Sequence, residues 1–197
     1  MEEKFEFLIQ GILDESFGMV DDFVDDQLLT GLRENLLRLR AAHEMEKAGV
    51  GKLGLYRTDE EIRGDYIHWL DNNTTDIHEQ AFFDVLTYFI RYLNVTCFTS
   101  INDYEFHYAA YPAGTFYQRH LDRFQTDSGR RFSFILYLNH EWDESCGGEL
   151  ALYLPDRELK VLPLGKRAVF FKSDKLEHEV LQGVKERYSL TGWLKSV

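Results

Sequence analysis

The sequence predicts a mainly β protein with added α: an antiparallel barrel of the jelly-roll, cupin-like kind, buttressed by N-terminal helices. Two observations carry this prediction. Apolar residues recur at helical spacing in the first half of the chain, and short alternating runs separated by Gly, Pro, Asp and Ser fill the second half. With 197 residues, 44% of them hydrophobic, the chain can bury a full core, so we expect one domain over 1–197.

Two helices are expected in the first half. Between residues 25 and 47, leucines recur at spacings of three and four while charged residues lie elsewhere around the helix, which indicates an amphipathic helix. A second helix follows the polar run DNNTTD and carries a broad apolar stripe over residues 77–93, with Thr75 or Asp76 as its N-cap. This stripe should cover one face of a sheet.

About eight strands are expected from residue 104 onward, because the runs YEFHYAAY, RFSFILYLN, GELALYLP, KRAVFF and RYSLTGWL have the spacing of an antiparallel barrel. In RFSFILYLN, Phe134 and Leu136 share one face, and Ile135 and Tyr137 share the other. A strand that is apolar on both faces is buried on both sides. Helices outside and a pocket inside would account for that burial.

Charge and cysteine content limit the possible partners. A formal charge of −12 argues against nucleic acid, because phosphate binding relies on clustered Lys and Arg, and it favours a neutral or basic partner. Two cysteines, Cys97 and Cys146, are too few for a disulfide framework and indicate a reducing compartment. The first residues contain neither a signal peptide nor a membrane span. We therefore expect a cytoplasmic monomer without a membrane partner.

The stretch YQRHLDRF contains the first candidate site. His120 and Asp122 are two residues apart, and on a strand such residues point to the same face, so both can reach one cation while Leu121 faces away. An isolated pair of this kind is more often a solvated turn with a salt bridge to Arg119 or Arg123. Residues further along the chain shift the balance toward a metal site.

His178 begins a short alternating run, and Arg187 follows it nine residues later at the start of RYSLTGWL. On that last strand Arg187 shares one face with Ser189, Thr191 and Trp193. A buried arginine is costly unless an anion pairs with it, and its planar guanidinium matches a carboxylate. A bound dicarboxylate would supply that anion. The alternative is an edge arginine paired with a nearby glutamate: Glu177, Glu179 or Glu186.

Two histidines and a carboxylate on one side of a metal form the facial triad of non-haem Fe(II) oxygenases, which leaves open positions for co-substrate and oxygen. Catalytic zinc is also held by three protein ligands, so the ligand types alone leave a zinc-dependent hydrolase open. The arginine after the second histidine favours the oxygenase, because zinc-dependent hydrolysis does not require it.

With these residues the chain resembles the Fe(II)- and 2-oxoglutarate-dependent dioxygenases, specifically the prolyl 4-hydroxylases of the hypoxia-inducible-factor type and their microbial relatives. The resemblance runs from about Leu36 to Trp193. The pattern HxD…H…R marks the wider superfamily, whereas IRGDxIxW and LYLNxxWD with GGxL mark the prolyl hydroxylase branch. It implies a double-stranded β-helix over 96–197 as the jelly-roll catalytic core, and mostly helical support over 1–95 with a substrate loop near 51–65.

The resemblance also implies roles for individual residues. His120, Asp122 and His178 would bind Fe(II), and Arg187 would pair with the distal carboxylate of 2-oxoglutarate. Further co-substrate contacts would come from Tyr137, Thr191, Tyr111 and Trp193. Apolar walls would come from Ile135, Leu150, Val180 and Trp193, and substrate contacts from Arg130, Arg63 and Asp65. For Arg130 a solvated turn is the alternative.

The activity implied is hydroxylation of a prolyl residue at C4 in an intracellular protein, with O2 consumed, succinate and CO2 released, and ascorbate in support. Bacterial relatives act on elongation factor Tu, which makes that protein a possible target. The alternatives are a related oxygenase acting on another residue or a small molecule, and a catalytically silent barrel that only binds. A segment from Tyr111 to His120 shorter than in the animal enzymes, and no C-terminal helix after Trp193, favour a compact microbial member.

Overall fold

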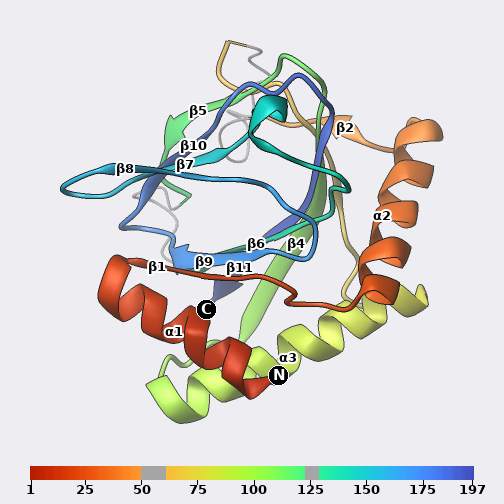
Figure 1. Cartoon of the computed structure of the whole chain (residues 1–197). Helices are drawn as coiled ribbons and strands as arrows, with labels where there is room; N and C mark the ends of the chain where they lie inside the picture. Colours follow the sequence, from red (N-terminus) through yellow and green to blue (C-terminus); the bar gives the residue numbers. More distant parts are fainter. Residues whose placement is uncertain (50–60, 123–128) are drawn as a thin grey trace.

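The computed structural model describes residues 1–49, 61–122 and 129–197, and it shows two antiparallel sheets with helices against the outer face of the larger one (Figure 1). Together the sheets form a double-stranded β-helix, as the strand pattern predicts. None of the helices within these ranges is long and apolar enough to cross a membrane. The predicted substrate loop falls mostly on residues 50–60, which lie outside the described ranges.

The larger sheet has seven strands in the order β1-β9-β6-β11-β4-β3-β2, and the smaller has four in the order β5-β10-β7-β8. The helices are α1 (Glu2–Glu15), α2 (Asp26–Ala41), α3 (Ile77–Cys97) and the short 3-10 helix η1 (Glu144–Cys146). The strands are β1 (Phe17–Val20), β2 (Glu46–Lys47), β3 (Tyr66–Trp69), β4 (Asp103–Tyr111), β5 (Tyr117–His120), β6 (Arg130–Tyr137), β7 (Leu150–Tyr153), β8 (Glu158–Val161), β9 (Ala168–Lys172), β10 (Glu177–Val180) and β11 (Arg187–Lys195).

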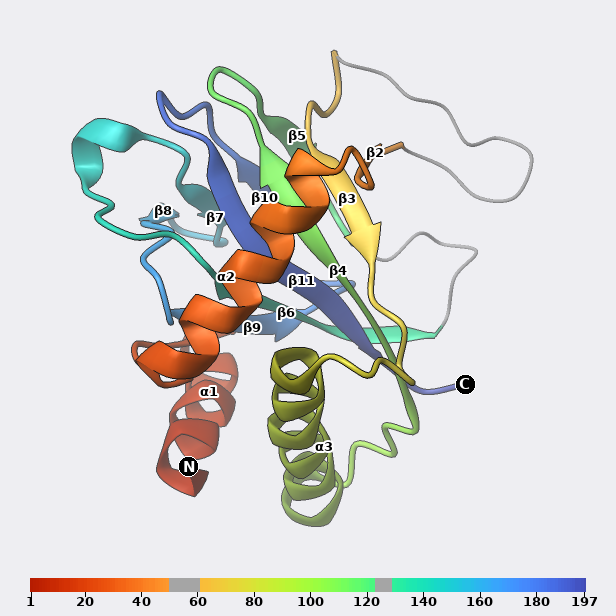
Figure 2. The same cartoon turned by 90° about the vertical axis from the view of Figure 1, so that its right-hand side faces the viewer.

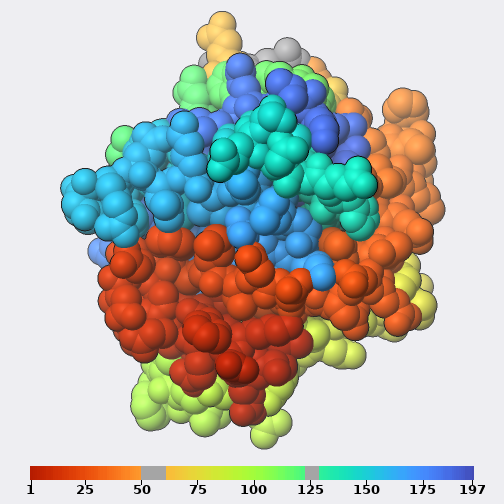
Figure 3. Space-filling view, viewed as in Figure 1, coloured from red at the N-terminus to blue at the C-terminus, as the bar shows by residue number. Residues whose placement is uncertain are grey.

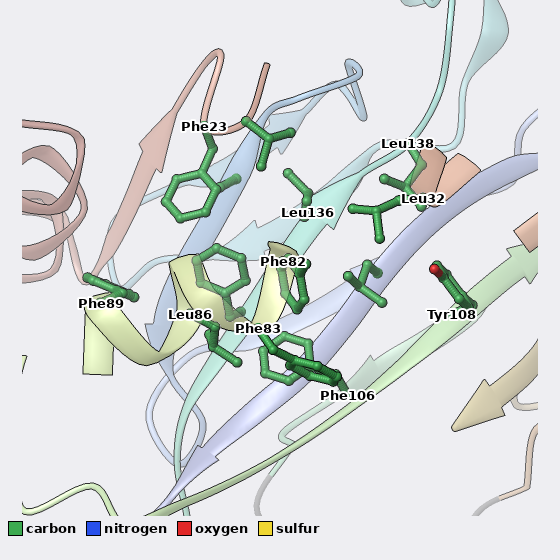
Figure 4. Close-up of a cluster of buried hydrophobic side chains, with 14 of the residues drawn as sticks. Phe23, Leu32, Phe82, Phe83, Leu86, Phe89, Phe106, Tyr108, Leu136 and Leu138 are labelled. Carbon is green, nitrogen blue, oxygen red and sulfur yellow. The ribbon is translucent and has the colours of Figure 1, made fainter. Parts of the chain in front are cut away.

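Helix α3 confirms the predicted start and the predicted stripe. The Asp76 carboxylate accepts hydrogen bonds from the backbone N–H groups of His78 (2.9 Å) and Glu79 (3.0 Å), so it caps the otherwise unpaired first turn. The apolar stripe of α3 packs into a core with the outer face of the large sheet (Figure 4). Its fully buried members are Phe82, Leu86, Phe89 and Leu93.

Helix α2 runs across the same face of the large sheet (Figure 2) but is shorter than predicted. It ends at Ala41, whereas the sequence predicts helix to residue 47. The chain turns because His43 adopts a left-handed backbone conformation (φ 57°), after which Glu46–Lys47 pairs with β3. The leucine repeat also stops at Leu39, so no apolar stripe continues beyond that turn.

The N-terminal segment adds two elements that the sequence pattern does not predict, α1 and β1. Figure 3 shows this segment, in red, between the blue strand segments and the yellow-green α3. Phe5 and Leu8 of α1 are fully buried, and β1 pairs antiparallel with β9. Gly18 permits the contact, because a Cβ at that position would lie 2.0 Å from the Leu8 carbonyl oxygen.

Strand β6 separates two cores and confirms its predicted two-sided burial. Phe134 and Leu136 belong to the core shared with the helices. Ile135 and Tyr137 belong to a second core between the two sheets. The second core therefore lies between the inner face of the large sheet and the small sheet, and the predicted pocket opens in the same space.

Candidate active site

A pocket of about 190 Å³ opens between the two sheets. The large sheet contributes alternate residues of β4 and β11, and the small sheet contributes residues of β5, β7 and β10. The face of β11 that the sequence predicts to meet a ligand points into this pocket, because Arg187, Ser189, Thr191 and Trp193 all line it. So do the predicted apolar wall residues Ile135, Leu150 and Val180.

The predicted metal ligands converge at the small sheet. His178 on β10 pairs across the ladder with His120 on β5. Ligand atoms of His120, Asp122 and His178 all lie within 4.8 Å of one another. The prediction that His120 and Asp122 share one face of a strand is wrong, because β5 ends at His120 and Asp122 lies in a bend beyond the strand. Leu121 does not face away either, since it is among the residues that line the pocket.

Backbone carbonyls fix the orientation of both imidazoles. Nδ1 of His120 lies 2.6 Å from the carbonyl oxygen of Gln118, and Nδ1 of His178 lies 3.1 Å from that of Leu176. A carbonyl oxygen only accepts, so each Nδ1 carries a proton, and Nε2 is the nitrogen of each ring that can bind a metal. Those Nε2 atoms lie 3.6 Å and 3.5 Å from the two carboxylate oxygens of Asp122.

A neighbouring hydroxyl group fixes the orientation of the Asp122 carboxylate. The Ser133 hydroxyl donates to its Oδ2 at 2.6 Å and also contacts the Ser173 hydroxyl at 2.9 Å. Burial acts to raise the pKa of Asp122, but its interactions with His178, His120 and Ser133 outweigh burial and hold that pKa well below the usual range. Asp122 is therefore an anion ready to bind a cation.

Burial also keeps the buried histidine neutral. It lowers the pKa of His178 to about 4, against the opposing effect of the Asp122 charge. Two imidazoles and one carboxylate suit Fe(II) as the facial triad, and they equally suit Zn(II). The donor set alone leaves these two metals undecided.

Arg187 is the second charged group of the pocket and is only 3% exposed. Its guanidinium carbon lies 5.1 Å from the ring centroid of Tyr111 and 4.9 Å from that of Tyr137. Among the described residues, Arg187 has no carboxylate partner, and its Nε makes no hydrogen bond. A buried cation without an anion indicates a site for an anionic ligand.

The alternative of an edge arginine paired with a glutamate is wrong. Glu177 pairs with Arg119, and Glu186 pairs with Arg40 at 3.0 Å. The remaining candidate, Glu179, bonds the Tyr153 hydroxyl. The arrangement leaves Arg187 free to bind a carboxylate from outside the chain.

Of the predicted co-substrate contacts, Tyr111 and Tyr137 flank the Arg187 guanidinium, whereas Thr191 and Trp193 lie further along β11. Tyr111 and Thr191 line it, and the Thr191 hydroxyl lies 3.0 Å from that of Ser189. Tyr137 is fully buried behind Arg187 and is not among the lining residues. Burial raises the pKa of the Tyr137 hydroxyl, so it stays protonated and can donate.

The two arginines among the predicted substrate contacts each form an ion pair within the chain. Arg130, the first residue of β6, pairs with Glu105 at 2.7 Å and stacks on Trp193, so the alternative of a solvated turn is wrong. Arg63 forms a two-pronged ion pair with Asp65 at 2.7 Å and 2.6 Å. Arg63 and Arg130 line the pocket, whereas Asp65 does not.

Tyr117 stacks on the His120 ring with centroids 3.6 Å apart, which agrees with its interpretation as packing around the metal ligands. Sequence reasoning missed Ser133, which positions Asp122. Sequence reasoning also missed His107, which lines the pocket and packs against Trp69 and Trp193. The alternation of YEFHYAAY places His107 on the same face as Tyr111, which is the signal that could have found it.

Comparison with known proteins agrees with this geometry. The family model of the 2OG-Fe(II) oxygenase superfamily matches residues 106–195. Egl nine homolog 1 of Mus musculus is 27% identical over 206 residues, which cover 95% of this chain and 48% of that protein. Human prolyl hydroxylase EGLN3 is 27% identical, with 95% of this chain and 82% of that protein covered. The chain spans about half the length of the Egl nine homolog 1 proteins it matches.

Comparison with solved structures gives the same result over nearly the whole chain. The crystal structure of a Pseudomonas putida prolyl-4-hydroxylase is 32% identical, with a TM-score of 0.88, and the match covers 98% of this chain and 99% of that one. A Trichoplax adhaerens prolyl hydroxylase in complex with a hypoxia-inducible-factor peptide fragment shares the fold at 24% identity, with a TM-score of 0.88. That match covers 99% of this chain and 90% of the Trichoplax chain.

Proposed function

Since the chain belongs to the 2OG-Fe(II) oxygenase superfamily and is related to its prolyl hydroxylases, we propose that it hydroxylates a prolyl residue of a protein. Fe(II), 2-oxoglutarate and O2 are the cofactor and co-substrates of this family. The balanced reaction converts a C–H bond, 2-oxoglutarate and O2 into a C–OH group, succinate and CO2. Bound Fe(II) supplies the activation of O2 and the oxidation of the C–H bond.

The single observation that carries the proposal is the buried Arg187, which has no carboxylate partner in the described part of the chain, in the same pocket as the three converging ligands. His120, Asp122 and His178 would hold Fe(II) through two Nε2 atoms and one carboxylate oxygen. Arg187 would bind the distal carboxylate of 2-oxoglutarate in a two-pronged hydrogen bond. Zinc-dependent hydrolysis does not require such an arginine.

The neighbouring residues orient the co-substrate and keep water away. We assign a hydrogen bond to that carboxylate to the Tyr137 hydroxyl, whose ring centroid lies 4.9 Å from the Arg187 guanidinium carbon, and packing beside it to Tyr111. Thr191, four residues further along β11, would contact the co-substrate away from that carboxylate. Ile135, Val180 and the other apolar wall residues exclude water from the reacting groups. The proline must then be held with its target carbon close to the metal, because positioning decides which bond reacts.

We assign contact with the protein substrate to Arg130 and Arg63, with Asp65 holding Arg63 in place. Oxidation at C4 is proposed because the Pseudomonas putida relative bears the name prolyl-4-hydroxylase. Bacterial members of the resembled branch act on elongation factor Tu, so that protein is the first substrate to test. The two free cysteines of this acidic chain agree with a reaction inside the cell, where elongation factor Tu is found.

The test is an aerobic reaction of the Fe(II)-loaded protein with 2-oxoglutarate and ascorbate. Succinate is measured alongside the mass of elongation factor Tu, of proline-containing peptides, and of amino acids and small molecules. The proposal expects succinate together with an added oxygen on a prolyl residue. An added oxygen on another residue or on a small molecule would identify a related oxygenase instead. A silent binding barrel predicts no succinate with any substrate.

A further inference from the structure

His107 is a buried polar side chain to which the proposed reaction gives no role. It lies on β4, is 3% exposed and lines the pocket. Its ring centroid is 4.8 Å from that of Trp69 and 5.5 Å from that of Trp193, so two indoles fix its orientation. Its Nδ1 has no hydrogen-bond partner among the described residues. Polar groups this deeply buried are nearly always paired in native proteins, so an unpaired one beside a pocket indicates a ligand.

The strand register places His107 away from the co-substrate anchor. Arg187 pairs with Tyr111 across β11 and β4, whereas His107 pairs with Thr191. Four residues along a strand separate these positions by roughly 14 Å. The residues between them on the inner face, Ala109 and Ser189, are small and leave room. The pocket thus has two polar regions, one around Arg187 and one around His107.

The region around His107 adjoins the metal ligands. Trp193, which packs beside His107, lies under the Arg130 guanidinium at 3.5 Å. Arg130 in turn donates to the backbone carbonyl of Asp122 at 3.2 Å. A group bound at His107 would therefore share the pocket with the proposed Fe(II) ligands, and the charge of Asp122 acts on the His107 ring.

The charge state of His107 limits what it can bind. Burial lowers its pKa to about 3, and the positive charges of Arg63 and Arg130 act in the same direction. The imidazole is therefore neutral near pH 7 and bonds through one N–H and one lone pair. A prolyl residue has no backbone N–H, so the polar backbone groups nearest its ring are carbonyls, which only accept. A neutral imidazole N–H matches such a carbonyl.

We propose that His107 is a specificity-determining residue that donates a hydrogen bond to a backbone carbonyl beside the target prolyl ring. This inference rests on the proposed function and deepens it, because it names the group of the protein substrate that His107 recognises. It makes His107 a residue for the protein substrate and separates it from Arg187, which serves the co-substrate.

The experiment uses the full chain and a pool of acetylated and amidated nine-residue peptides with a fixed central proline. The wild type, His107→Gln and His107→Phe are compared. Gln retains a donor, whereas Phe retains the packing against the indoles without one. Peptide and 2-oxoglutarate KM values come from the Fe(II)-loaded enzyme with O2. Peptide Kd values come from fluorescence polarisation of the best labelled peptide on protein holding Mn(II) and 2-oxoglutarate.

We expect His107→Phe to raise the peptide KM and Kd about tenfold, the usual loss for one hydrogen bond. His107→Gln should stay within about threefold of the wild type, and the KM for 2-oxoglutarate should change less than about twofold in either variant. Thermal unfolding reports whether each variant folds. If His107→Phe does not fold, His107→Met replaces it with the same expectation.

Three results would overturn the inference alone, while the wild type still hydroxylates peptides of the pool. The first is an unchanged peptide KM and Kd in the apolar variant. The second is a loss in His107→Gln as large as in His107→Phe. The third is a 2-oxoglutarate KM that rises in parallel with the peptide KM, as a general disturbance of the pocket would cause. A wild type that hydroxylates no peptide of the pool overturns the proposed function together with this inference.

Discussion

His178 on β10 lies directly opposite His120 on β5, and their ring centroids are 4.3 Å apart. This pairing brings residues 58 positions apart in the sequence to one point of the small sheet. Asp122 then needs only to turn back from the end of β5 to complete three ligands within 4.8 Å. We assign this cluster to a metal ion.

The first prediction concerns metal binding by Asp122. Mn(II) or anaerobic Fe(II) at about a hundred times its Kd should stabilise the wild type by about 2.7 kcal/mol and raise its Tm by roughly 5 to 10 °C. Asp122→Asn should lose this shift, because a neutral amide cannot replace the carboxylate. Glu177→Gln, which alters an exposed carboxylate beside His178, is the control and should keep it. A full metal-induced shift in Asp122→Asn would refute the ligand assignment.

The second prediction concerns Ser133, whose hydroxyl orients the Asp122 carboxylate at 2.6 Å. Removing a hydrogen bond to a metal ligand typically costs 10- to 100-fold in metal affinity, so Ser133→Ala should weaken Mn(II) binding by about tenfold. Isothermal titration gives the Kd. Ser173→Ala is the matched control, since Ser173 contacts Ser133 but, among the described residues, does not hydrogen-bond the Asp122 carboxylate, and the loss of metal affinity should be smaller. Equal losses in the two variants would contradict the direct role of Ser133.

The third prediction concerns Arg187. Removing one partner of a buried charge pair costs about 2 to 5 kcal/mol, so Arg187→Leu should weaken 2-oxoglutarate binding by about a hundredfold. Without 2-oxoglutarate, the same variant should be no less stable than the wild type, because the substitution removes a buried charge that has no anion. Titration calorimetry and urea unfolding measure the two effects. Arg119→Leu, which changes an exposed arginine, is the control. An unchanged 2-oxoglutarate Kd in Arg187→Leu would show that the anchor lies elsewhere.

The fourth prediction concerns the pH dependence of the metal-free protein. The pKa values of His107 and His178 are lowered to about 3 and about 4, below the value of about 6.5 in an unfolded chain. Between pH 6.5 and about 4 the unfolded state therefore binds more protons than the folded state. Consequently, the free energy of unfolding should rise with pH across this window and level off above it.

Urea unfolding in a chelating buffer at several pH values measures this slope. His107→Gln should flatten it by removing one of the two buried imidazoles. His43→Gln, which alters an exposed histidine, should leave the slope as in the wild type. A stability that stays constant from pH 4 to 6.5 in the wild type would show that neither histidine is buried as a neutral group.

The sequence predicts the metal ligands and Arg187 because their chemistry is encoded locally. Strand alternation fixes which residues share a face, and the run RYSLTGWL identifies one polar face that must meet a ligand. The structure confirms that face at Arg187, Thr191 and Trp193. Asp122 reaches the site by a bend rather than along the strand, so the predicted convergence was right for an incomplete reason.

The remaining features depend on contacts between distant segments. Alternation in YEFHYAAY shows that His107 and Tyr111 share a face but not that this face looks into the pocket. Ser133 meets Asp122 only after β6 is placed beside the small sheet. Likewise, α2 ends at Ala41 because the chain turns there to pair with β3, and residues after Ala41 have ordinary helical propensity.

The central claim is that one pocket couples 2-oxoglutarate turnover to oxygen insertion at a prolyl residue, and labelled oxygen tests it most directly. The Fe(II)-loaded wild type is supplied with 2-oxoglutarate, ¹⁸O2, elongation factor Tu and the fixed-proline peptide pool, with His120→Ala as control. We expect a labelled hydroxyl on a prolyl residue in a yield that matches succinate, and neither product from the control. Succinate without label on any prolyl residue, or equal products from His120→Ala, would contradict it.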